Sequence, residues 1–212
     1  MTKSLSILLS SVCLAAVLTG CRPSAAEKPA SGEELFALCV SCHGPQGHGK
    51  PDIAAPAIAG LPHWYVKEQL RKFRGGARAY HADDIEGLRM RPMSRQLATD
   101  GDVEMVSAYV AALPKPAPVA PVVVGDAKAG QTAYATCSAC HMANGVGNEA
   151  LKAPPLTHQS DWYLRAQLNK FRKGMRGTHK DDVTGAQMRP MAMTLADDAA
   201  VANVVAYIGT LR

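Results

Sequence analysis

Residues 39–43 read Cys-Val-Ser-Cys-His, and residues 137–141 read Cys-Ser-Ala-Cys-His. The two motifs belong to a longer internal repeat, because residues 32–113 align with residues 130–211 at a constant offset of 98 positions and without a gap. Such a repeat indicates two copies of one structural unit, and two copies are too few for a solenoid. Each copy has about eighty residues, a size at which a polypeptide core alone is only marginally stable. We therefore expect each unit to enclose an additional group.

The segment between the copies predicts a linker. It contains Pro114, Pro116, Pro118 and Pro121. Proline lacks a backbone N–H and has a fixed φ, so this spacing excludes a helix and favours an extended, semi-rigid chain. The sequence thus divides into a signal peptide (1–20), a tether (21–31), an N-terminal domain (32–113), a Pro-rich linker (114–125) and a C-terminal domain (126–212).

The first twenty residues have the pattern of an export signal. Lys3 precedes an apolar run that continues to Leu18 and is too short to span a bilayer. The run ends in Leu-Thr-Gly followed by Cys21, which resembles a bacterial lipoprotein signal. By that resemblance Cys21 becomes the lipidated first residue of a periplasmic, membrane-anchored lipoprotein of a Gram-negative bacterium. The alternative is an ordinary cleaved signal with a chance cysteine, and both alternatives predict export.

Composition narrows the class of protein. Apolar residues make up 47% of the chain and charged residues 19%, which is typical of globular domains and not of disordered tails. The net charge is +5, and the sequence has no long basic run, so we expect no nucleic-acid partner. The composition also argues against collagen-like, coiled-coil and polytopic membrane proteins.

Periodicity inside each unit predicts an all-α fold. Residues 33–39 favour a short helix, and the Gly- and Pro-rich residues 44–60 favour a loop. Residues 64–73 have apolar positions at helical spacing, and two glycines follow them. A last helix is expected after Thr99 or Asp100, with its counterpart near the C-terminus. The apolar stripes of these two helices are Val103, Val106, Val110 and Leu113, and Val201, Val204, Val205, Ile208 and Leu211.

The Cys-x-x-Cys-His motif is the attachment signature of c-type haem. Two thiols reach the two vinyl groups at one porphyrin edge, and the adjacent histidine supplies a neutral imidazole to the iron. The motifs predict two covalently bound haems, held by Cys39, Cys42, Cys137 and Cys140, with His43 and His141 as iron ligands. The alternatives are a zinc site, a thioredoxin-like thiol pair and disulfides. One zinc ion would need both cysteine pairs in one cage, and a thiol pair does not need a histidine after each second cysteine.

Iron held by histidine needs a second axial ligand or has an open site. Each unit offers two methionines at matched positions, Met90 and Met93 in the first, Met188 and Met191 in the second. Thioether ligation suits electron transfer because it raises the reduction potential. The alternative is that these side chains fill the core. Periodicity does not choose within each pair.

Both units resemble class I cytochromes c, and the tandem resembles the dihaem cytochromes c4. The resemblance rests on the two motifs, on the glycines and the Pro-Ala-Ile-Ala-Gly segment after the first motif, and on Met-x-Pro-Met before Leu97. It implies two tandem all-α domains, each wrapped around a covalent haem c. It also implies that the ligating methionine stands seven residues before a leucine, which selects Met90 and Met188. Met93 and Met191 then pack near the haem.

The resemblance assigns further residues around the haem. The carbonyls of Pro56 and Pro154, thirteen residues after each haem histidine, are expected to accept the imidazole N–H and fix the ring. Arg91 and Arg189, beside the ligating methionines, either pair with haem propionates or lie on the surface. The second unit departs from the pattern with Met142 in place of Gly44, so its haem pocket is expected to differ in shape.

These features predict an electron carrier in a periplasmic respiratory chain and not an enzyme. By analogy with cytochromes c4, the donor is a quinol-oxidising complex or a dehydrogenase, and the acceptor is a terminal oxidase or reductase. One alternative is a dihaem enzyme, a peroxidase or thiosulfate-oxidising type, with one open haem. Another is a fixed electron-transfer subunit of a larger dehydrogenase or oxidase. The sequence leaves these alternatives open.

Overall fold

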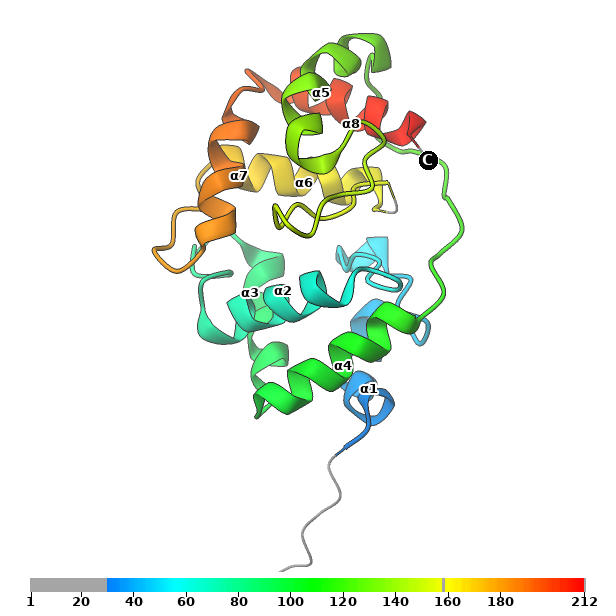
Figure 1. The fold of residues 1–212 in the computed structure, drawn as a ribbon, viewed down its shortest axis with the longest axis vertical. Coiled ribbons are helices and arrows are strands. Elements are labelled where there is room, and N and C mark those ends of the chain that lie inside the picture. Colours follow the sequence, from blue (N-terminus) through cyan, green and yellow to red (C-terminus); the bar gives the residue numbers. More distant parts are fainter. Residues whose placement is uncertain (1–29, 158, 212) are drawn as a thin grey trace, which may run out of the picture.

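The computed structural model describes residues 30–157 and 159–211, so the predicted signal peptide and Cys21 lie outside the described residues. The described chain is all-α, as predicted, and forms two similar four-helix units (Figure 1). Their only β-pairing in the described ranges is one isolated bridge in each unit. The first unit comprises α1 (Gly32–His43), α2 (His63–Gly75), α3 (Ile85–Arg95) and α4 (Asp100–Ala112), with a 3-10 turn at Pro51–Ile53. The second comprises α5 (Ala127–His141), α6 (Asp161–Arg172), α7 (Val183–Met193) and α8 (Asp198–Thr210).

The helix starts follow from side-chain caps. Ser31 and Glu34 form a capping box at the start of α1, and Thr99 and Asp102 form another at the start of α4. Each box satisfies backbone N–H groups that have no partner inside the helix. The predicted cap at Thr99 is therefore confirmed. The helix predicted at 33–39 is longer than expected, because α1 continues through the Cys-x-x-Cys-His motif to His43.

The first and last helices of each unit cross at a glycine. A Cβ atom at Gly130 on α5 would lie 1.9 Å from the carbonyl oxygen of Asn203 on α8, and Gly32 meets α4 in the same way. Aromatic rings pack beside each crossing, with 5.3 Å between the centroids of Tyr134 and Tyr207. The predicted valines of α4 and α8 are buried in these cores, whereas Leu113 lies just beyond the end of α4.

Helices α3 and α7, which bear the methionines, were not predicted. Their sequence argues against a helix because each contains a proline, Pro92 or Pro190. Both helices nevertheless form after an aspartate cap, since Asp84 accepts a hydrogen bond from Gly87 N–H and Asp182 accepts one from Gly185 N–H.

The two units pack against each other. Figure 1 shows α2 and α6 between the two cores, while the linker runs along the outside. Residues 114–126 form neither helix nor strand, as the prolines predict. The end of the linker is tied to the second unit, because the N–H groups of Val122 and Val123 both donate to Oδ2 of Asp161 at 2.5 Å.

Within residues 30–157 and 159–211, no single helix is long and apolar enough to cross a membrane. Helices α7 and α8 reach the required length and composition only as a pair, and they are bent by 109° at their junction.

Candidate haem sites

The four motif cysteines lie on the last turns of α1 and α5. Cys39 and Cys137 are half-buried, Cys42 and Cys140 are exposed, and none of the four is in a disulfide. Burial, with a smaller contribution from Cys42, raises the pKa of Cys39 to about 11, and burial also raises the pKa of Cys137. Redox-active Cys-x-x-Cys pairs have a lowered thiol pKa. The first cysteine of each motif therefore lacks the lowered pKa of a thioredoxin-like thiol.

The motif histidines are buried and oriented by proline carbonyls. Nδ1 of His43 lies 2.8 Å from the carbonyl oxygen of Pro56, and Nδ1 of His141 lies 2.8 Å from that of Pro154. Burial lowers the pKa of both imidazoles, although the hydrogen bond to the carbonyl acts in the opposite direction. Each ring is thus neutral near pH 7, donates from Nδ1 and leaves Nε2 free to bind a metal ion.

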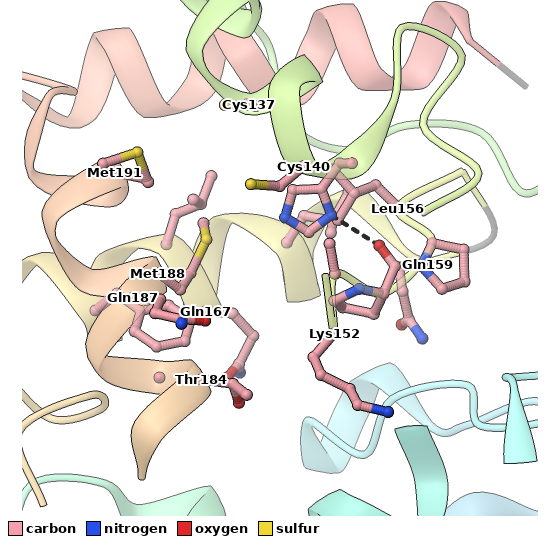
Figure 2. Close-up of a pocket in the computed structure, with 18 of the residues that line it drawn as sticks. Cys137, Cys140, Lys152, Leu156, Gln159, Gln167, Thr184, Gln187, Met188 and Met191 are labelled. Carbon is pink, nitrogen blue, oxygen red and sulfur yellow. Dashed lines mark hydrogen bonds between the residues drawn. The ribbon is translucent and has the colours of Figure 1, made fainter. Parts of the chain in front are cut away.

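A cavity in the second unit is lined by the motif histidine of that unit and by both of its predicted methionines. His141, Met188 and Met191 line it, together with Cys137 and Cys140. Figure 2 shows Met188 reaching from α7 toward the same space that Cys140 faces from α5. Met188 is half-buried, whereas Met191 is 38% exposed.

The first unit repeats this difference between its methionines. Met90 is half-buried and packs against the core of its unit, whereas Met93 is 37% exposed. In both units the first methionine of the pair, Met90 or Met188, is therefore the more buried one.

The zinc alternative finds no support in the described part of the chain. No group of three or more His, Cys, Asp or Glu side chains there is arranged to hold a metal ion. The two cysteine pairs instead belong to two separate helices, α1 and α5, in two separate units.

Comparison with known proteins agrees with this arrangement. The family model described as "Cytochrome c" matches residues 29–114 and again residues 127–212. The chain belongs to the cytochrome c family. Its two Cys-x-x-Cys-His motifs, one in each domain, imply two covalent haems.

Relatives of this cytochrome match it over most of their length. A thiosulfate dehydrogenase electron acceptor of Stutzerimonas stutzeri is 32% identical over 81% of this chain and 79% of its own. Cytochrome c4 of Azotobacter vinelandii is 30% identical over 89% of this chain and 91% of its own. The crystal structure of reduced cytochrome c4 from Pseudomonas stutzeri superposes with a TM-score of 0.65 at 28% identity, over 84% of this chain and 95% of that chain. The chain is a dihaem electron carrier like cytochrome c4.

The polar groups around the second cavity fit a haem, which carries two carboxylates. Arg176 lines the cavity, is 7% exposed and stacks its guanidinium 4.3 Å from the ring centroid of Phe171. Burial, followed by the charge of Arg78, lowers the pKa of Arg176 to about 10, so it remains a cation at neutral pH. Its Nε is buried without a hydrogen-bond partner among residues 30–157 and 159–211. A buried cation with an unused donor suits an anionic group.

Arg78 repeats this arrangement in the first unit. It is 6% exposed, lies 4.1 Å from the ring centroid of Phe73, and also has a buried Nε without a partner in the described chain. Sequence reasoning missed Arg78 and Arg176, although both recur at the offset of the repeat. The predicted Arg91 and Arg189 share the unused donor, because Nε of each is also buried without a partner in the described chain. Arg91 donates to the carbonyl of Ala79, and Arg189 is not among the residues that line the cavity. The pairing of these two arginines with haem propionates stays a prediction.

The second cavity also uses residues of the first unit. Tyr65 and Gln69, both on α2, line it together with Tyr163 and Gln167 of α6. The cavity that would hold the second haem is therefore lined by residues of both domains. This sharing was not predicted, because a repeat shows that two units exist but not how they pack.

Met142 keeps the backbone of the glycine that it replaces. Its φ of 67° and ψ of 156° nearly match the 77° and 161° of Gly44. Glycine adopts this region freely, but other residues are strained there. The hydroxyl of Tyr134 donates to the carbonyl of Met142 at 2.8 Å, which helps to hold this conformation.

Proposed function

We propose that both haems have one histidine and one methionine as axial ligands, His43 with Met90 and His141 with Met188. The main support is the combination found in each unit: a neutral imidazole held through Nδ1 and a half-buried methionine on the third helix of the unit. Met93 and Met191 are more exposed and are assigned to packing at the edge of the site.

Such sites carry single electrons. The bound haem iron supplies the one-electron chemistry, by alternating between its ferric and ferrous states. The protein holds both axial positions, orients the imidazole through Pro56 or Pro154, and surrounds the site with apolar side chains. Sulfur ligation favours the ferrous state and raises the reduction potential. With both positions filled, neither site is open to a substrate, which supports a carrier and not a peroxidase.

Ligand substitution tests the axial assignment. The ferric holoprotein is compared with Met90→Ala and Met188→Ala by NMR of the ligand methionine methyl groups and by absorption in the red region, where sulfur-ligated ferric haem has a weak band. Each variant is expected to lose one of two methionine signals and to gain one high-spin haem. Met93→Ala and Met191→Ala are the matched controls and are expected to keep both signals. Wild type with a high-spin haem, or control variants that lose ligation, would reject the assignment.

We further propose that the protein is exported and receives electrons from a periplasmic dehydrogenase. The predicted signal at residues 1–20, with Cys21 as lipid anchor, supports export. A dehydrogenase that oxidises thiosulfate is favoured as donor, because a relative of 32% identity is a thiosulfate dehydrogenase electron acceptor. A quinol-oxidising complex is the second candidate donor, from the similarity to cytochromes c4, and a terminal oxidase or reductase is the expected acceptor.

Stopped-flow reduction distinguishes the donors. The oxidised protein is mixed with a thiosulfate dehydrogenase and thiosulfate, or with a quinol-oxidising complex and quinol, at equal concentrations. We expect fast reduction of both haems by the first mixture and slow reduction when the dehydrogenase is omitted. Faster reduction by the quinol-oxidising complex would reverse the order of the candidates without affecting the ligand assignment.

A further inference from the structure

Two buried ion pairs cross between the units in a reciprocal pattern. Nζ of Lys72 on α2 donates to Oδ1 of Asp182 at 2.7 Å, and Nζ of Lys170 on α6 donates to Oδ1 of Asp84 at 2.5 Å. The two lysines are equivalent in the repeat, and so are the two aspartates. Both aspartates are at most 1% exposed, and both lysine side chains are 11% exposed. Each unit therefore contributes one cation and one carboxylate to the contact.

The two aspartates also begin the helices that carry the methionines. Asp84 caps α3, which contains Met90, and Asp182 caps α7, which contains Met188. In each case the oxygen that accepts from the lysine also accepts the backbone N–H of the residue three positions later, at 3.1 Å. The other carboxylate oxygen of each aspartate is buried without a hydrogen-bond partner in the described ranges. The lysine of the opposite unit is thus the main group that offsets the cost of burying each capping carboxylate.

Contacts around Lys72 extend the link to the first turn of α7. Lys72 also pairs with Glu68, at 2.8 Å, and donates to the hydroxyl of Thr184. That hydroxyl donates in turn to Oε1 of Glu68 at 2.9 Å. On the opposite side Lys170 pairs with Glu86, the equivalent of Thr184, at 2.7 Å. Each methionine helix is therefore bound at its first turn by side chains of the other unit.

A buried carboxylate without a compensating cation is strongly unfavourable. When the lysine is removed, the carboxyl therefore either takes up a proton, which weakens its capping hydrogen bond to the backbone N–H, or moves toward water together with the capped end of the helix. The inward methionine stands six positions after each aspartate, which is about 9 Å along a helix. A shift at the cap is transmitted over this short distance because the helix is a rigid element. The sulfur atom then moves relative to the histidine on the other side of the site.

We propose that each unit positions the methionine of the other: Lys72 acts on Met188, and Lys170 acts on Met90. The inference rests on the methionine ligation proposed above. It implies that the contact between the units helps to form each haem site. Substitution of Lys72 on α2 then alters methionine ligation at the second haem and not at the haem of its own unit.

The test measures how easily imidazole displaces methionine from each ferric haem. The holoprotein, Lys72→Gln and Lys170→Gln are titrated with imidazole while the two methionine methyl signals are followed by NMR. The signals are assigned with Met90→Ala and Met188→Ala. Couplings of this kind amount to about a three- to tenfold change in an equilibrium constant. Lys72→Gln is expected to raise imidazole affinity by that factor at the second haem only, and Lys170→Gln at the first haem only.

Lys67→Gln is the matched control, because Lys67 lies on α2 but pairs with Glu104 of its own unit. This variant is expected to leave the imidazole affinity of both haems unchanged. A second readout uses Asp182→Asn, which keeps the cap and removes the charge. If Lys72 acts through Asp182, the double variant Lys72→Gln/Asp182→Asn differs little from Asp182→Asn alone.

The outcomes separate this inference from the ligand assignment. Equal changes at both haems, a change at the haem of the substituted unit, or no change would each reject the crossed positioning while the wild-type methionine signals remain. Absence of those signals in wild type would instead reject the proposed ligation, and the inference with it.

Discussion

Arg78 and Arg176 meet at one oxygen atom. Nη1 of Arg176 donates to Oε1 of Gln167 at 2.6 Å, and Nη2 of Arg78 donates to the same oxygen at 3.4 Å. Two buried cations therefore converge between the units on a single neutral acceptor. Like charges in a buried position repel each other, so the arrangement is favourable only with anions nearby. Asp182 supplies one such anion, through its charge interaction with Arg176, and the carboxylates of a bound haem would supply others.

The first prediction concerns the charge of Arg176. Removing a buried cation beside a haem destabilises the ferrous form relative to the ferric form, because the ferrous site carries one more electron. Arg176→Gln is therefore expected to lower one reduction potential by tens of millivolts, where a tenfold change in a one-electron equilibrium corresponds to about 59 mV. Potentiometric titration of the two haems measures the shift. Arg165→Gln, an exposed position on α6, is the control. An equal shift in the control would indicate a general charge effect and not a local one.

Much of this site could be predicted from sequence because the haem motif is local. Cys-x-x-Cys-His, the proline thirteen residues later and the methionine pair are each defined by spacing along the chain. The apolar stripe of α4 and its Thr99 cap could also be predicted, because a helix face and a cap depend on residues that are close in sequence.

The contacts between the two units could not be predicted from local sequence patterns. Lys72 and Lys170 stand near the ends of polar helices, where a lysine is usually solvated, and only the packing reveals their partners. Helices α3 and α7 were missed because Pro92 and Pro190 weigh against a helix, and tertiary contacts outweigh that cost. Arg78 and Arg176 were missed because an arginine is usually exposed, and only the packing shows that both are buried, stack on Phe73 and Phe171 and share Gln167 as an acceptor.

The second prediction concerns backbone strain at the end of α5. Met142→Gly removes a non-glycine residue from a conformation that costs about 1–3 kcal/mol, while glycine loses more entropy on folding. Met142 is 41% exposed, so little packing is lost. We expect the free energy of unfolding to rise by about 1 kcal/mol in a urea titration. The reciprocal change Gly44→Ala is expected to lower the free energy of unfolding by a similar amount. An added Cβ at Gly44 has no neighbour within 4 Å, so backbone strain and not a steric clash accounts for the loss. A stabilising Gly44→Ala would contradict this account.

The third prediction concerns the crossing of α5 and α8. Gly130→Ala places a methyl group against the backbone of Asn203, so the helices must separate. Overpacking of this kind costs about 1–3 kcal/mol. Gly209→Ala is the matched control, because a Cβ there meets no atom within 4 Å and alanine favours a helix. Thermal unfolding is expected to show a lower midpoint for Gly130→Ala and an equal or higher midpoint for Gly209→Ala. Equal midpoints in both variants would mean that the crossing tolerates a wider separation.

The fourth prediction concerns the pH dependence of the contact between the units. Burial alone raises the pKa of Asp182, but the hydrogen bond and charge of Lys72, the charge of Arg176 and the N–H of Gly185 outweigh burial and lower it below its ordinary value. The unfolded-state pKa of an aspartate is about 3.9. A group with a lowered folded-state pKa contributes stability that is present above the unfolded value and is lost as the pH falls through the folded value.

Asp182→Asn removes this contribution at every pH. The variant is therefore expected to be less stable than wild type by roughly 1–3 kcal/mol near pH 7. Urea unfolding at a series of pH values measures the difference, which should stay constant down to about pH 5 and narrow in stronger acid as the wild-type carboxylate becomes protonated. Asp181→Asn is the control, since within the described part of the chain its exposed carboxylate pairs only with the adjacent Lys180 and with His179 on the same loop. A difference between wild type and Asp182→Asn that widens as the pH falls would show that the neutral carboxyl, and not the ion pair with Lys72, stabilises the contact.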